Sequence, residues 1–188
     1  MKKFVRPSSI AVFGALAVSL ALTACGPDTG SGVQTRANGA GPSAAQNGPA
    51  KVGDTVTLKG MDDGAKADVT VLKVVDAPNG TDDVDAVPAG KRYYAVQFQI
   101  KNSGTKAYDD APSNGAKVID AAGQGFPTVT TYADTTAGPN FGTIVDIAPG
   151  DMAVGYLVFA VPADSQITKV QFGMDSGVSG HTGQWVIG

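Results

Sequence analysis

The clearest pattern in the chain is the alternation of apolar and polar positions in residues 91–101. The two alternating sets are Tyr94, Val96, Phe98 and Ile100 on one side, and Tyr93, Ala95, Gln97 and Gln99 on the other. Successive side chains of a β-strand point to opposite faces. The pattern therefore predicts a half-buried strand, with one face in a core and the other toward solvent.

Similar short runs, rich in valine, threonine and aromatic residues, recur along the chain and are separated by turn residues. The predicted strands cover residues 54–59, 67–76, 91–101, 116–121, 126–132, 152–161, 167–172 and 184–187. Turns are expected at 61–64, 79–80, 114–115 and 148–151, with an acidic loop at 77–90 and further loops around Tyr108 and over 133–143. About eight short strands without a long amphipathic helix predict an all-β sandwich or barrel, and the sandwich is the preferred interpretation.

The N-terminus has a different pattern. Basic residues at Lys2, Lys3 and Arg6 precede an apolar run over residues 10–24. A basic start, an apolar middle and small residues at the end are typical of a secretory signal peptide. The run is shorter than the roughly 20 residues that a transmembrane helix needs. We therefore expect residues 1–24 to be a cleaved signal peptide.

The run ends in Leu22-Thr23-Ala24-Cys25, which contains the only cysteine of the chain. This tetrapeptide resembles the lipobox of bacterial lipoproteins. The resemblance implies cleavage between Ala24 and Cys25 and a diacylglyceryl group on the Cys25 sulfur, which would anchor the protein to the outer face of the cell membrane. Two acyl chains give lasting attachment where a single chain does not. The alternative is an ordinary cleaved signal with a cysteine beside it by chance.

Residues 25–50 are dominated by small and polar residues and contain almost no large aliphatic side chain. Such a segment cannot bury enough surface to offset its ordering entropy. We expect a disordered, lipidated linker over 25–50 and a folded domain over 51–188.

Composition narrows the function classes. All seventeen acidic residues of the 188-residue chain are aspartate, and loss of the three basic residues of the signal would change the formal charge from −3 to −6. An acidic chain without clustered lysine and arginine argues against binding to nucleic acid. With its one cysteine acylated, the domain would contain no disulfide.

Candidate catalytic residues are few. His181 is the only histidine, and although Ser176 and Ser179 are close in sequence, no Gly-x-Ser-x-Gly motif is present. We interpret His181 as a surface-loop residue rather than a catalytic base. The expectation is that the protein is not an enzyme and uses no cofactor.

Metal sites are also weakly indicated. Zinc would need several histidine or cysteine ligands, and a copper site could draw only on His181 with Met61, Met152 and Met174. Calcium would need the acidic loop to meet another carboxylate in space. The candidate ligands for calcium are Asp82, Asp83, Asp85, Asp109 and Asp110. A solvated acidic loop is the preferred interpretation.

Aromatic residues allow two interpretations. Trp185 and the tyrosines could form a stacking platform for sugars or peptides, but side chains of this type are more often buried in a core. We interpret them as core residues. Tyr93 and Tyr108 are the two that we expect nearest the surface.

Three motifs point to a family. They are Pro88-Ala89-Gly90-Lys91-Arg92-Tyr93-Tyr94 leading to Lys101-Asn102, then Ala148-Pro149-Gly150-Asp151, and Gly155-Tyr156-Leu157-Val158-Phe159 leading to Val161-Pro162. Over residues 51–188 the chain resembles a domain-of-unknown-function family common in lipoproteins of Gram-positive, actinobacterial-type bacteria. The resemblance implies an immunoglobulin-like antiparallel sandwich of the telokin-like, immunoprotective-extracellular-protein type. Asp151 stands where that family more usually has glutamate, and the family supplies no catalytic residues.

The expected function is a membrane-anchored, non-enzymatic binding module. Its partner would be an envelope protein, a cell-wall polymer or a small ligand, and the alternative is a lipoprotein that handles calcium or copper. Edge strands of a sandwich can also pair two copies, and the sequence leaves the oligomeric state open.

Overall fold

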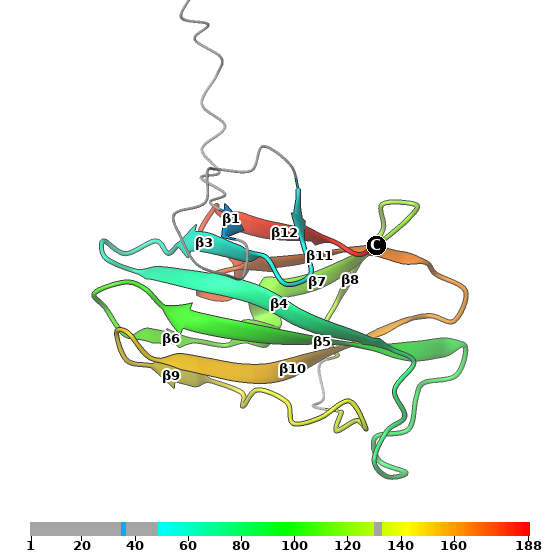
Figure 1. The fold of residues 1–188 in the computed structure, drawn as a ribbon. Coiled ribbons are helices and arrows are strands. Elements are labelled where there is room, and N and C mark those ends of the chain that lie inside the picture. Colours follow the sequence, from blue (N-terminus) through cyan, green and yellow to red (C-terminus); the bar gives the residue numbers. More distant parts are fainter. Residues whose placement is uncertain (1–34, 37–48, 130–132) are drawn as a thin grey trace, which may run out of the picture.

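The fold is an all-β sandwich, seen in a computed structural model that describes residues 35–36, 49–129 and 133–188 (Figure 1). The predicted signal peptide, Ala24 and Cys25 lie outside the described residues. So does most of the predicted linker, of which the structure describes Thr35–Arg36, residue 49 and Ala50.

Two five-stranded sheets form the layers, and a small third sheet accompanies them. The first sheet has the order β1-β3-β4-β5-β10, with bounds Thr35–Arg36, Thr55–Lys59, Lys66–Asp76, Lys91–Asn102 and Met152–Pro162. The second has the order β2-β12-β11-β7-β8, with bounds Ala50–Lys51, Thr182–Val186, Ile167–Gly173, Ala116–Asp120 and Gly125–Pro127. The third pairs β6 (Tyr108–Asp110) with β9 (Val145–Ile147). All pairs are antiparallel except β2 with β12.

Most predicted strands are confirmed within a residue or two, and the exceptions have local causes. The predicted strand 126–132 is confirmed only at its start, by β8, which ends at Pro127, a residue that cannot donate to a strand ladder. Residues 130–132 lie outside the described residues. The turn expected at 114–115 is the end of a four-residue helix, α1, over Pro112–Gly115. A one-turn 3₁₀ helix, η1, spans Asp175–Gly177. The loop expected around Tyr108 contains the short strand β6, in which two of the three residues are aspartates, a residue type that is depleted in strands.

The core is centred on three aromatic rings contributed by both sheets. The Phe98 ring on β5 lies 5.4 Å from that of Phe172 on β11 and 6.3 Å from that of Trp185 on β12, the second pair edge to face. All three side chains are fully buried. The Trp185 indole N–H donates to the backbone carbonyl of Asp54, 2.9 Å away. The prediction that Trp185 belongs to the core is confirmed.

A second, smaller apolar cluster covers part of the outer face of the first sheet. It joins Tyr93 and Ala95 of β5 to Tyr156 and Val158 of β10, with Ala133 above them. The backbone N–H of Val129 donates to the Val158 carbonyl, 2.9 Å away, which adds this stretch to the free edge of β10. The outer face of β5 is therefore buried along half its length, and the prediction of a half-exposed strand is corrected there.

The two tyrosines expected near the surface are both buried. Tyr93 and Tyr108 are each 4% exposed. Tyr93 is covered by the second cluster, whose covering segment is distant in sequence. Tyr108 alternates with the exposed Asp109 along β6, so its ring points into the main core. No helix in the described part of the chain is long and apolar enough to cross a membrane.

Replacement of Trp185 by alanine tests the role of the aromatic core. We expect Trp185→Ala to lower the free energy of unfolding by about 3–5 kcal/mol, because a large buried ring is lost and a cavity remains. The control Lys117→Ala, at an exposed position of β7 in the same sheet, should change it by less than about 0.5 kcal/mol. Urea denaturation measures both, and similar losses in the two variants would contradict this assignment.

Candidate functional site

The connection between β4 and β5, residues 77–90, is called the acidic loop here. It contains Asp82, Asp83 and Asp85 and no lysine or arginine. The Asp82 carboxylate accepts the backbone N–H groups of Val84 and Asp85, at 2.9 and 3.0 Å. The loop therefore has an ordered tip that carries three negative charges.

The acidic loop is held against the segment 133–138. The Thr81 N–H donates to the Asp134 carbonyl at 3.0 Å, and the Thr136 N–H donates to the Asn79 carbonyl at 2.9 Å. Gly80 lies so close to the loop's own backbone that an added Cβ would be 2.0 Å from the Asp85 carbonyl oxygen. A side chain at that position would push the loop open.

A groove of about 490 Å³ lies between the acidic loop and the stretch that follows β8. We call it the loop groove. Its apolar lining includes Tyr93, Phe126, Val129 and Ala160. Its charged lining consists of Asp85 and Lys91. The volume falls within the range of small-molecule and peptide-binding clefts, roughly 300–1,000 Å³.

Tyr93 connects the groove to the acidic loop. Its hydroxyl donates to the Ala86 carbonyl, 3.3 Å away. Burial raises the pKa of Tyr93, and the nearby Asp85 carboxylate raises it further. The phenol therefore stays neutral at physiological pH and serves as a hydrogen-bond donor rather than as a base.

The acidic candidates named from the sequence fall into two separate places. Asp82, Asp83 and Asp85 lie in the acidic loop, beyond the Asp76 end of β4. Asp109 and Asp110 lie on β6, whose partner β9 is bound at the other end of β5 through the Asn102 side chain and the Ile147 carbonyl, 2.8 Å apart. Strands of this length span about 30 Å, and Figure 1 shows the two regions at opposite ends of the sheet.

Asp110 has a structural role in that second place. Its carboxylate accepts the backbone N–H and the hydroxyl of Ser176, each at 3.0 Å, and the N–H of Ala111 at 2.8 Å. Asp175 and Ser176 both have positive φ, of 54° and 55°, a conformation that is unfavourable for these residues. Asp110 therefore holds a strained turn in place.

Metal and catalytic candidates are not assembled in the described part of the chain. It contains no group of three or more histidine, cysteine, aspartate or glutamate residues that could hold a metal ion. Met174 is buried in the core, whereas Met61 and Met152 are 69% and 54% exposed. His181 lies in the turn before β12, where its carbonyl accepts the Ser179 hydroxyl at 3.4 Å.

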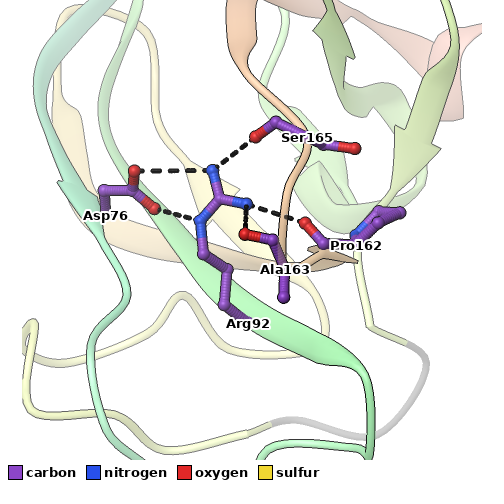
Figure 2. A network of polar contacts seen from close by, with 5 residues as sticks. All are labelled: Asp76, Arg92, Pro162, Ala163 and Ser165. Carbon is purple, nitrogen blue, oxygen red and sulfur yellow. Dashed lines mark hydrogen bonds and ion pairs between the residues drawn. The ribbon is translucent and has the colours of Figure 1, made fainter.

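Arg92 forms the most extensive polar network that involves one side chain (Figure 2). Its guanidinium donates to both oxygens of Asp76, at 2.6 and 3.4 Å. It also donates to three backbone carbonyls at and just beyond the end of β10: Pro162 at 2.7 Å, Ala163 at 3.2 Å and Ser165 at 2.7 Å. All five N–H donors of the side chain are used, so Arg92 has none left for a ligand.

The Arg92 network closes the base of the acidic loop. Asp76 directly precedes the loop and Arg92 follows its end by two residues, so their ion pair brings the two ends together. The Ala77 N–H adds a bond to the Tyr93 carbonyl at 2.9 Å. The sequence pattern did not predict this role, because its one signal is an arginine beside Lys91 at the start of a strand.

A second groove, of about 370 Å³, lies on the outer face of the second sheet and is called the glycine groove here. Lys117, Gln171, Ser176 and Thr182 line it, together with several glycines. Its lining is mostly neutral and polar, in contrast to the apolar lining of the loop groove.

Comparison with known proteins gives a family and a fold. Residues 50–182 match the family described as a domain of unknown function, DUF4352. A solved structure of a secreted protein from Mycobacterium tuberculosis, MPT63, is similar at 17% identity, with a TM-score of 0.51 over 76% of this chain and 99% of that one. A putative lipoprotein from Bacillus subtilis, YcdA, gives 14% identity and a TM-score of 0.50 over 69% of this chain and 38% of that one. No curated protein gives a significant match.

Substitution of Arg92 by lysine tests the network. Lysine keeps the charge but cannot reach Asp76 and three carbonyls at once. We expect Arg92→Lys to lower the free energy of unfolding by about 1.5–3 kcal/mol, the range for hydrogen bonds to charged groups. The exposed neighbour Lys91→Arg serves as the control and should be nearly neutral. If thermal denaturation shows that Arg92→Lys is as stable as this control, the network does not close the loop base.

Proposed function

The chain belongs to the family described as a domain of unknown function, DUF4352, and on this premise we propose that it is a lipid-anchored, extracytoplasmic binding module without enzymatic activity. The observation that carries the proposal is the loop groove. It combines an apolar lining with only two charged groups, Asp85 and Lys91. Concave, mostly apolar sites with a few polar groups are typical of ligand binding.

The groove's own residues support a binding role rather than catalysis. Its titratable groups are Asp85, Lys91 and Tyr93, and neither histidine nor cysteine is among its lining residues. Burial and the Asp85 carboxylate raise the pKa of Tyr93, which keeps this group neutral. A general acid–base pair with pKa values near neutrality would need a different set of residues.

Two observations support a location outside the cytoplasm. The sequence has the basic and apolar regions of a signal peptide, followed by Leu22-Thr23-Ala24-Cys25. The similar solved structures are of a protein described as secreted and of a protein described as a putative lipoprotein. We assign the lipid to Cys25, with cleavage after Ala24, and the protein to the outer face of the cell membrane.

The position of the loop groove suits a tethered module. The first described element after Cys25 is β1, which pairs with β3, and Figure 1 shows β1 on the side of the domain away from the acidic loop. A domain held from Cys25 would turn the groove away from the membrane and toward partners in the envelope.

Replacement of Cys25 by serine tests the anchor. A hydroxyl cannot take the place of the thiol, so we expect Cys25→Ser to move most of the protein from the membrane fraction to the medium. A serine substitution elsewhere in the same segment, Ala44→Ser, should leave the protein in the membrane fraction. Fractionation with mass spectrometry of the N-terminus measures both. Cys25→Ser protein that stays with the membrane would rule the anchor out.

A bulky residue in the loop groove tests the binding role. Ala86 lines the groove and Ala89 does not, although both are exposed residues of the acidic loop. We expect Ala86→Trp to reduce the recovery of co-purifying envelope components at least severalfold, because the indole fills the groove. Ala89→Trp is the matched control and should behave like the unmodified protein. Quantitative affinity purification from intact cells compares the three proteins, and equal recovery with all of them would count against the groove.

A further inference from the structure

The wall of the loop groove carries unpaired negative charge. The acidic loop contributes Asp82, Asp83 and Asp85, and Asp134 lies beside it, bonded through its carbonyl to the Thr81 N–H. The ion pairs found in the described residues are Asp76 with Arg92 and Asp62 with Lys106, so none involves these four carboxylates. Of the four, Asp85 lines the groove itself, and Lys91 is the one cation of the lining.

The same region presents apolar surface. Val84 at the tip of the acidic loop is 89% exposed, and Val87 is 36% exposed. Val84 lines the groove together with Phe126 and Val129. A ligand with apolar groups and positive charges would therefore match both the lining and the wall.

The groove's shape and chemistry favour a polypeptide among such ligands. Tyr93 is only 4% exposed, and Phe126, the other aromatic residue of the lining, is partly buried against the main core. A sugar chain would find little ring surface to stack on, and a polyanion would be repelled by the carboxylates. In an extended peptide, side chains alternate between two directions, so one set can enter the groove while the other meets the acidic wall.

We propose that the loop groove binds an extended segment of a partner protein that combines lysine or arginine with apolar side chains. This inference rests on the proposed function and specifies the ligand of the same groove. The apolar side chains contact Phe126 and Val129, and the basic side chains pair with the carboxylates of the acidic loop.

The test is an NMR titration of the chain from residue 25 onward, carrying Cys25→Ser so that no lipid attracts the probes. The first probe is a short synthetic peptide that alternates lysine with leucine. The second is the same peptide with glutamate in place of lysine, and the third is a chitin oligosaccharide. Resonances of the loop groove are followed at Tyr93, Phe126 and Val129, and those of the glycine groove at Gln171 and Thr182.

We expect only the lysine peptide to shift the loop-groove resonances. The triple variant Asp82→Asn, Asp83→Asn, Asp85→Asn should weaken its binding roughly tenfold, since exposed charge pairs each contribute modestly. At position 82, asparagine keeps the side-chain oxygen with which Asp82 accepts the Val84 and Asp85 N–H groups. Raising the ionic strength from about 0.01 M to about 0.1 M should also weaken binding, because the screening length falls from roughly 30 Å to 10 Å.

A second triple variant, Asp63→Asn, Asp109→Asn, Asp151→Asn, is the matched control. It removes the same number of charges from exposed residues outside the acidic loop, and it should leave the affinity for the lysine peptide unchanged. Equal weakening by both triple variants would mean that binding follows net charge alone, and the inference would be wrong.

The other outcomes separate the ligand class from the groove itself. Binding of the glutamate peptide or the oligosaccharide at Tyr93, Phe126 and Val129 would overturn the ligand class and leave the proposed binding function intact. If no probe shifts these resonances, the ligand class is again overturned. The comparison of Ala86→Trp with Ala89→Trp then decides the proposed function independently.

Discussion

The contact of Phe98 with Phe172 and Trp185 is the interaction on which the rest of the structure depends. These rings come from β5, β11 and β12 and fill the space between the two sheets. The indole N–H of Trp185 also reaches the Asp54 carbonyl, which ties the last strand to the start of β3. Because the sandwich has no cysteine in its described residues to cross-link, its layers are joined by packing of this kind.

The loop groove arises from how the first sheet is covered. One end of its outer face is buried under the smaller cluster around Tyr93 and Tyr156, and the groove opens beside Tyr93, where this cover meets the acidic loop. The Arg92 network fixes the base of that loop, and backbone bonds to residues 134 and 136 fix its far side. The acidic loop is therefore held at its base and along its far side, which lowers the entropy cost of binding a ligand in the groove.

The sequence was enough to predict what depends on neighbouring residues. The alternation in 91–101 gave the strand β5 and its inner face correctly, and Trp185 was correctly assigned to the core. The errors concern contacts between distant segments. Tyr93 looked like an outward residue because alternation shows only which face a residue is on, and Ala133 and Val129, which help to bury it, come some forty residues later. The groove depends on the same long-range contacts, so its lining could not be read from any one stretch, although the acidic loop that forms its wall was recognised.

The most direct test of the central claim, that the loop groove is where this protein meets its partner, is photocrosslinking in living cells. A photoreactive benzoylphenylalanine would replace Phe126 in the loop groove and, in a parallel strain, Lys117 in the glycine groove. The account predicts a discrete crosslinked partner from position 126 and not from position 117, with the attached peptide rich in basic and apolar residues. Crosslinks of equal yield and identity from both positions, or from position 117 alone, would contradict it.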